Sequence, residues 1–350
     1  MNIQQLLELT IQRDASDLHL SPGFPPTLRI HGDLIPIPGT QILTAQDVET
    51  IITPLLSEMQ KKIFAQSFEL DFSFELEGRG RFRVNVYRQK NGPAASLRLI
   101  PLRIIPLEEL GLPPACDKFA QLKQGFILVT GPTGHGKSTT LASFINKINQ
   151  TRAVHVITIE DPIEYVYPPG KALIDQREMY KDTRGWNNAL RAALREDPDV
   201  VLIGEMRDFE TIASAMTIAE TGHLVFATLH TNSAAQSVDR IIDVFPEIQQ
   251  PQIRLQAAST LEAIISLRLI PTIEPGRTLA TELLIATPAV RNIIREGKSY
   301  LIDNVIETSA EYGMQVLETS LVELVRSGRI SPEVALGFSL RPALLNKLLH

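Results

Sequence analysis

The stretch that decides the fold is residues 125–148, GFILVTGPTGHGKSTTLASFINKI. It starts with an apolar run, passes through a loop with three glycines and ends with the apolar spacing of a helix. A buried strand, a short loop and a helix in this order form the repeating unit of parallel α/β sheets. The stretch therefore predicts an α/β domain with a functional loop at the carboxyl end of one strand.

The loop, Gly131 to Ser138, fits the pattern G-x-x-x-x-G-K-[ST] at every fixed position. Its glycines let backbone N–H groups point inward around phosphate oxygens, and the helix that follows adds a positive dipole. Lys137 can then reach the β- and γ-phosphates of a nucleotide, and the Ser138 hydroxyl can bind Mg²⁺. The residues expected to contact the nucleotide here are Gly131, Pro132, Thr133, Gly134, His135, Gly136, Lys137, Ser138 and Thr139.

His135 stands at a variable position of this pattern. Two interpretations remain open for it: a side chain that faces solvent, or one that contacts the nucleotide or a neighbouring subunit.

Outside the loop the chain shows two patterns. Residues 1–100 alternate polar and apolar side chains in several short runs and hold two amphipathic segments, which predicts a small α+β domain. Residues 101–115 are a proline-rich linker. From residue 116 to 350, continuous apolar runs alternate with helical segments, as in parallel sheets buried on both faces, and the part after about residue 287 is helical. We expect an α/β protein of two domains.

The composition narrows the class of protein. The 350 residues are 44% hydrophobic and carry a net charge of −6, which argues against a dedicated nucleic-acid binder. Cys116 is the single cysteine, so neither an intramolecular disulfide nor a cysteine-based zinc site can form. The N-terminus lacks the pattern of a signal peptide, and no apolar run approaches the ~18 residues of a membrane span. We therefore expect a cytoplasmic protein that does not insert into a membrane.

Acidic residues follow two of the apolar runs. HVITIEDPIEY delivers Glu160, Asp161 and Glu164, and DVVLIGEMRD delivers Glu205. In the usual magnesium-side strand of a phosphate-loop protein an Asp ends the apolar run, but Gly204 stands there instead. Parallel strands bind ligands at their carboxyl ends, so both groups of acids are expected near the loop, with Glu160 and Asp161 among the nucleotide contacts.

Other interpretations of these polar residues stay open. Glu160 and Asp161 can instead cap a helix that starts at Pro162, and Glu205 can be a surface acid at a strand end. His223 and His230 flank the run LVFATL, where each can serve the site or be a hydrogen-bonded structural residue.

Four stretches carry a resemblance to a known family: GPTGHGKSTT, ITIEDPIEY, RAALREDPDVVLIGEMRD and AETGHLVFATLHTNSA. They resemble the Walker A, Asp-box, Walker B and His-box motifs of the type II/type IV secretion ATPase superfamily. Within it the chain is most similar to the type IV pilus retraction ATPases, because ASDLHL at 15–20 and TPAVRNIIREGK at 287–298 resemble two further stretches of that branch. The four-cysteine zinc insertion of many extension and export ATPases is absent. His135 departs from the family, where a Ser is usual.

The resemblance implies a PAS-like N-terminal domain followed by a RecA-like ATPase domain that includes the C-terminal helices. It implies a homohexamer that binds ATP and Mg²⁺. In this family the Walker B acid is the Glu after a Gly, which is Glu205 here, and it shares the metal with Ser138. The Asp-box Glu with a catalytic role matches Glu164. The resemblance does not decide which of the two glutamates polarises the attacking water.

The same resemblance extends to histidines and arginines. His223 and His230 match the His-box, the first as a nucleotide contact and the second as a catalytic residue. Arginines of the N-terminal domain are also implied in catalysis, and Arg83 and Arg98 are the two that we expect to neutralise the charge of the γ-phosphate. The alternative for both is salt bridging on strand faces.

The implied function is a motor that hydrolyses ATP to power type IV pilus retraction and twitching motility. Its implied partner is an inner-membrane platform protein (PilC-like) at the cytoplasmic face, and residues 287–298 are implied in retraction rather than in hydrolysis. Three alternatives remain: an extension or secretion ATPase of the same superfamily, a RecA-like DNA motor, and a nucleotide-binding regulator or scaffold with little turnover.

Overall fold

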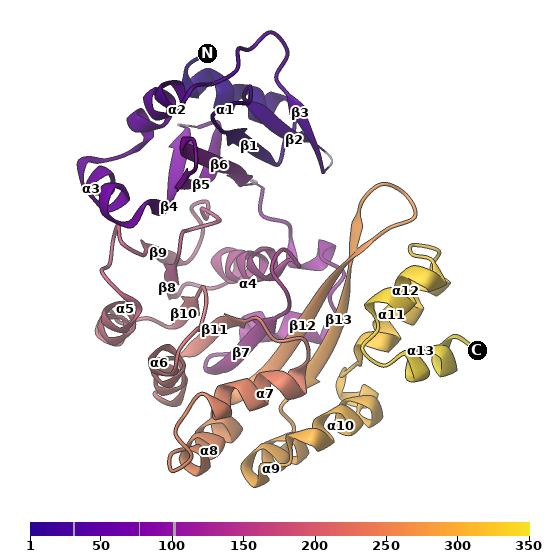
Figure 1. The fold of residues 1–350 in the computed structure, drawn as a ribbon. Helices are drawn as coiled ribbons and strands as arrows, with labels where there is room; N and C mark the ends of the chain where they lie inside the picture. Colours follow the sequence, from indigo (N-terminus) through magenta and orange to yellow (C-terminus); the bar gives the residue numbers. More distant parts are fainter. Residues whose placement is uncertain (31, 77, 101–102) are drawn as a thin grey trace. The chain divides into compact units, whose positions relative to one another are not determined.

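The computed structural model describes residues 1–30, 32–76, 78–100 and 103–350. These residues form two compact units (Figure 1). The first comprises Met1–Arg103 together with Asp161–Val166, and the second comprises Ile104–Glu160 and Tyr167–His350. Pro101 and Leu102, which begin the predicted linker, lie outside the described residues. None of the helices in the described part of the chain has the length and apolar character needed to cross a membrane.

The first unit is built on a six-stranded antiparallel sheet with the order β3-β2-β1-β6-β5-β4. Its strands are β1 (Asp17–Leu20), β2 (Thr27–Ile30), β3 (Asp33–Pro36), β4 (Glu69–Leu76), β5 (Gly80–Gln89) and β6 (Gly92–Ile100). Its helices are α1 (Ile3–Gln12), α2 (Ala45–Ile52) and α3 (Glu58–Ser67). Thr44 caps α2 by accepting a hydrogen bond from the Asp47 N–H group. The core joins apolar residues of α1, α2 and the sheet.

The second unit contains a seven-stranded sheet with the order β13-β12-β7-β11-β10-β8-β9 (Figure 1). All neighbouring strands are parallel except β12 and β13, which form an antiparallel hairpin. The strands are β7 (Gly125–Thr130), β8 (His155–Glu160), β9 (Leu173–Glu178), β10 (Val200–Ile203), β11 (Leu224–Leu229), β12 (Leu261–Pro271) and β13 (Arg277–Ile285). The helices between them are α4 (Lys137–Thr151), α5 (Trp186–Ala193), α6 (Phe209–Glu220), α7 (Ala234–Asp243) and α8 (Gln250–Thr260).

Both faces of this sheet are covered, which explains the continuous apolar runs. On β7, Phe126 and Leu128 belong to one hydrophobic cluster, whereas Ile127 and Val129 belong to another on the opposite face. Phe144 of α4 stacks on Phe226 of β11 with ring centroids 5.4 Å apart in the second cluster. The predicted mixed α/β class is confirmed.

Helices follow the last strand, as the sequence predicts. They are α9 (Pro288–Glu296), α10 (Ile302–Thr308), α11 (Leu317–Arg326), α12 (Pro332–Phe338) and α13 (Pro342–Leu349). Residues of α11, α12 and α13 pack with Ile270 and Ala280 of the β12–β13 hairpin in a separate small core. The C-terminal helices are therefore anchored on the hairpin.

Gly204 follows β10 at a point where the chain comes close to β8. Its N–H group donates to the Ile159 carbonyl at 2.8 Å, and a Cβ atom at this position would lie 3.3 Å from both the Glu160 Cα and the Ile159 oxygen. These contacts are tighter than ordinary van der Waals packing. The strand thus ends in Gly because the backbone of the neighbouring strand occupies the space for a side chain.

Replacing Gly204 by Ala should lower the free energy of unfolding by about 1–3 kcal/mol, because backbone atoms of β8 cannot move aside as a side-chain tip can. Urea denaturation of the purified protein measures this change. Gly337→Ala is the matched control, since nothing lies within 4 Å of its added Cβ in α12. Equal stability of the two variants would contradict the close approach at Gly204.

Candidate nucleotide-binding site

The G-x-x-x-x-G-K-S loop connects the carboxyl end of β7 to the first turn of α4. Gly131, Gly134 and Gly136 have φ of 140°, 80° and 88°, values that favour glycine over residues with a side chain. At Gly131 an added Cβ would also lie only 2.6 Å from the Leu267 carbonyl oxygen of β12. The sequence pattern therefore has a backbone cause at each of its glycines.

Lys137 is the first residue of α4, and its side chain is buried against the loop. Its ammonium group donates to the carbonyl oxygens of Gly131 at 2.7 Å and Pro132 at 3.0 Å. These contacts hold a positive charge inside the turn of the loop. An anion bound by the loop N–H groups would lie close to this charge.

His230, just past the end of β11, lies between Lys137 and Glu205. Its Nδ1 atom is 3.4 Å from the Lys137 Nζ, and its Nε2 atom is 3.2 Å from a Glu205 carboxylate oxygen. An ammonium only donates and a carboxylate only accepts, so the tautomer with the proton on Nε2 satisfies both neighbours. The ends of β10 and β11 and the start of α4 thus meet through one imidazole.

Glu205 also pairs with Arg207, whose Nη2 and Nε atoms lie 2.9 Å from its two carboxylate oxygens. Partial burial raises the pKa of Glu205, but Arg207, His230 and Lys137 outweigh this effect and hold the pKa below its usual value. Glu205 is therefore ionised at neutral pH. Glu205 is 24% exposed and belongs to a charged group beside the loop, which favours a site residue over a surface acid at a strand end.

The donor set fits Mg²⁺ that also binds nucleotide phosphates. Ser138 supplies a hydroxyl in the first turn of α4 and Glu205 supplies an ionised carboxylate, and both are oxygen ligands of the kind that Mg²⁺ prefers. Within the described ranges there is no group of three or more His, Cys, Asp or Glu side chains that could hold a metal alone. These residues therefore suit an ion that keeps most of its ligands from phosphates and water.

Glu160 ends β8, and its carboxylate accepts from the Thr158 hydroxyl at 2.7 Å and from Gln176 of β9 at 3.3 Å. Asp161 begins the segment that belongs to the first unit. The alternative of helix capping before Pro162 is wrong, because no helix begins in residues 161–170, all of which are described. The role of Glu160 and Asp161 as nucleotide contacts stays a prediction.

Within the first unit, Arg83 of β5 lies opposite Arg98 of β6 in the antiparallel register. Arg83 lies 3.5 Å from a carboxylate oxygen of Glu164, and Arg98 donates to Asp17 of β1 at 2.9 Å. Both arginines thus form salt bridges, which the sequence analysis gave as the alternative to a catalytic role. They also place three predicted catalytic side chains, those of Arg83, Arg98 and Glu164, in one unit.

Two further residues of the first unit are buried: Arg81, which the sequence reasoning passed over in favour of Arg83 and Arg98, and Asp17, which it missed. Arg81 is buried and donates to the Ile163 carbonyl at 3.2 Å, which ties the segment 161–166 to β5. Asp17 is also buried and pairs with both Arg98 and Arg29. The signal for Asp17 was an acid at a position of the run SDLHLS that faces arginines on neighbouring strands.

His223 is placed away from the phosphate loop. It precedes β11, and its carbonyl accepts from Gly125 N–H at the start of β7, whereas the loop follows the other end of β7. The two strands are parallel with Leu224 beside Gly125 and Leu229 beside Thr130, so the whole length of the strands separates His223 from its own loop. Its ring nitrogen contacts the Ile218 carbonyl at 3.0 Å, as the structural alternative predicts.

His135 faces β12. Its Nδ1 atom accepts from the Leu269 N–H group at 3.0 Å, so the side chain fastens the loop to the neighbouring hairpin. Burial lowers the pKa of His135, and Arg268, Lys137 and Arg277 lower it further, which keeps the nitrogen free to accept. The side chain thus binds backbone through Nδ1, and its contact with nucleotide or a neighbouring subunit stays a prediction.

Residues Pro288–Glu296 of the segment 287–298 form α9, with Thr287 as the N-cap. Val290 and Ile294 are buried, whereas Ala289 is exposed. Arg291 donates to the Ala258 and Ser259 carbonyls at the end of α8 and pairs with Glu262 at 2.7 Å. Arg295 is exposed, so the two arginines have different surroundings.

Comparison with known proteins gives the family of this chain. Residues 2–280 match the family model described as "Type II/IV secretion system protein". The chain is 47% identical to the type IV pilus retractation ATPase PilT of Pseudomonas aeruginosa PAO1, over 96% of this chain and 97% of that protein. It is 50% identical to a twitching motility protein of Neisseria gonorrhoeae, over 89% of this chain and 83% of that protein.

Among solved structures, the crystal structure of the pilus retraction motor PilT with bound ADP is similar to this chain with a TM-score of 0.92. The sequences are 44% identical, and the match covers 99% of each chain. Family model, relatives and structure cover both units. This chain therefore belongs to the type II/IV secretion system protein family.

Proposed function

We propose that the chain is a motor ATPase that hydrolyses ATP to power type IV pilus retraction. The observation that carries this proposal is the contact of His230 with both Lys137 and Glu205 beside the phosphate loop. Through this contact the His230 imidazole links Lys137, the expected phosphate-binding cation, to the ionised Glu205 carboxylate. A movement of either group would change its contact with the imidazole. Relatives named for pilus retraction and twitching motility are matched over most of their length, and they support retraction as the process that the ATPase powers.

In this proposal the loop binds the phosphates, and Lys137 exchanges its two carbonyl partners for phosphate oxygens. His230, bonded to Lys137 and Glu205, orients the carboxylate and senses whether the lysine is engaged. Glu205 and Ser138 would hold Mg²⁺, which supplies charge neutralisation for the phosphates. Glu164, Arg83 and Arg98 would serve catalysis from the first unit, the arginines by neutralising charge on the γ-phosphate.

The proposal includes architecture and partners that the resemblance implies. The first unit is a PAS-like domain and the second a RecA-like domain, and six copies form a ring. The ring works at the cytoplasmic face of the inner membrane on a PilC-like platform protein. Support for this part comes from the family of the chain and from its similarity to a solved retraction motor.

Lys137→Ala should lower the rate of ATP turnover by at least about 100-fold, because the loop loses the charge that meets the γ-phosphate. Phosphate release by the purified protein measures this rate. Lys147→Ala is the matched control, since this lysine lies on the same helix but pairs with Glu108 away from the loop. Turnover that survives in Lys137→Ala would rule out the site.

The direction of force separates retraction from extension, the main alternative. Deleting the gene should leave cells with excess surface pili and no twitching motility, because assembled pili would no longer be withdrawn. Electron microscopy of surface pili measures the outcome, and a plasmid copy of the gene should restore the normal number. Cells without pili would instead assign the chain to extension.

A further inference from the structure

The turn between β11 and α7, residues 230–233, carries His230 and is held from several sides. Arg268 of β12 donates to the Asn232 carbonyl at 3.2 Å and to its side-chain oxygen at 2.9 Å. The Thr231 and Ser237 hydroxyls lie 2.6 Å apart, and Ser233 caps α7. A turn fixed in this way leaves little freedom for the histidine that it presents.

The most buried of these contacts with the turn comes from Glu282 of β13. Its carboxylate accepts a hydrogen bond from the N–H group of Ala234, the first residue of α7, at 2.7 Å. Both residues are almost completely buried: Ala234 is 0% and Glu282 is 2% exposed. At this buried place the acid satisfies a backbone donor that would have no water to bind.

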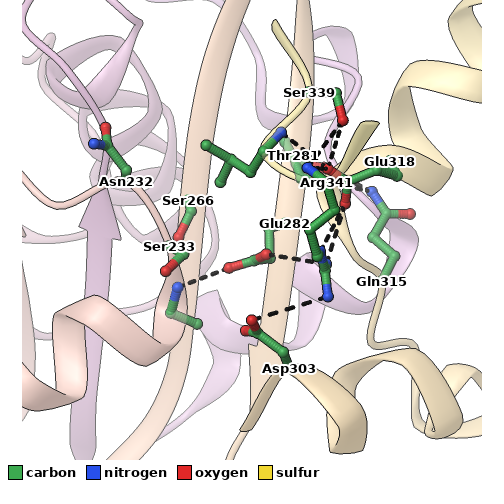
Figure 2. Close-up of polar contacts among 12 residues, drawn as sticks. Asn232, Ser233, Ser266, Thr281, Glu282, Asp303, Gln315, Glu318, Ser339 and Arg341 are labelled. Atoms are coloured by element: carbon green, nitrogen blue, oxygen red, sulfur yellow. Dashed lines mark hydrogen bonds and ion pairs between the residues drawn. The ribbon is translucent and has the colours of Figure 1, made fainter. Parts of the chain in front are cut away.

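Glu282 in turn belongs to a polar cluster with the C-terminal helices (Figure 2). Arg341, at the start of α13, lies 4.0 Å from Glu282 and 4.0 Å from Asp303 of α10. Its Nε and Nη2 atoms donate to Glu318 of α11 at 3.2 and 3.1 Å. One guanidinium therefore faces three carboxyl groups from three different elements.

The carboxyl groups of Glu318 and Glu282 differ in the number of hydrogen bonds that they accept. Besides its two bonds from the Arg341 guanidinium, Glu318 accepts from the Ser339 hydroxyl and from the N–H groups of Leu340 and Arg341, at 2.9–3.0 Å. Among the described residues, Glu282 accepts one hydrogen bond, from the Ala234 N–H group, and its other carboxylate oxygen lies 4.0 Å from the Arg341 Nη2 atom. Glu282 therefore holds the turn mainly by supplying an oxygen that accepts a hydrogen bond.

The charge of Glu282 agrees with this view. Burial raises the pKa of Glu282 to about 7, and Asp303 and Glu318 add to the rise. The Ala234 N–H group and Arg341 oppose it. An amide in place of the carboxyl would keep the acceptor oxygen and resemble the protonated acid.

We propose that Glu282 is a positioning residue for ATP hydrolysis, which holds the turn that presents His230 to Lys137 and Glu205 through the Ala234 N–H group. Arg341 lies 4.0 Å from the same carboxyl group and bonds Glu318, so the His230 turn and the C-terminal helices belong to one network of charged groups. This inference rests on the proposed ATPase function. It assigns a role to a residue remote from the phosphate loop.

The test compares Glu282→Ala with Glu282→Gln in steady-state ATP hydrolysis by the purified protein. Glu282→Ala removes the acceptor and should lower kcat by about 10-fold while KM for ATP stays within about 2-fold, because a misplaced catalytic group costs rate rather than binding. Glu282→Gln keeps the acceptor and should retain most of kcat. Glu323→Ala, an exposed position of α11, is the control for a Glu-to-Ala change outside the cluster.

Amide hydrogen exchange of residues 231–238 gives a second readout that does not depend on turnover. It should rise in Glu282→Ala and stay near wild type in Glu282→Gln. A Glu282→Ala protein with wild-type kcat, or a Glu282→Gln protein as impaired as Glu282→Ala, would overturn the inference. Lys137→Ala is measured alongside: if it keeps turnover, the proposed function fails, and if only Glu282→Ala is unimpaired, the inference alone fails.

Discussion

The contact of one imidazole with two opposite charges is the constraint on which the site depends. His230 can bond both Lys137 and Glu205 only if the ends of β10 and β11 and the start of α4 stay within a few ångströms of one another. The parallel register of β7, β11 and β10 sets these positions, and apolar clusters on both faces of the sheet hold the register. The packing of the sheet thus determines the chemistry at its edge.

A second close contact, between β10 and β8, bears on Gly204. A Cβ atom at this position would lie 3.3 Å from the β8 backbone, which disfavours a side chain there, and the acid comes one residue later. There, Glu205 meets His230 and Arg207, and its charge is stabilised despite partial burial. The site is therefore built differently from the usual arrangement, not damaged.

Local patterns in the sequence predicted much of this structure. The phosphate loop could be recognised because its glycines meet backbone requirements that leave few substitutes, and five strands of the second unit were visible as apolar runs. β9 was missed because its sequence, LIDQRE, is polar at an edge of the sheet, and β12 because Leu261 follows α8 with no turn residue between them.

Long-range contacts could not be read from the sequence. The sequence places His223 and His230 at opposite ends of one strand, but only the parallel pairing of β11 with β7 shows that the His230 end adjoins the phosphate loop. The sequence also carried no sign that His135 accepts a hydrogen bond from the β12 backbone, a contact with a residue more than a hundred positions away. Glu282 was passed over within the apolar run LATELLIA, although an acid in such a run signals a buried partner.

A double-mutant cycle on ATP turnover tests the central claim that His230 and Glu205 act as one unit. The cycle measures kcat of His230→Ala, Glu205→Gln and the double variant. If His230 works by orienting Glu205, the double variant should lie within about 3-fold of the more impaired single variant, because the second change removes nothing that is still working. Losses that multiply across the two substitutions would show two independent residues and contradict the account.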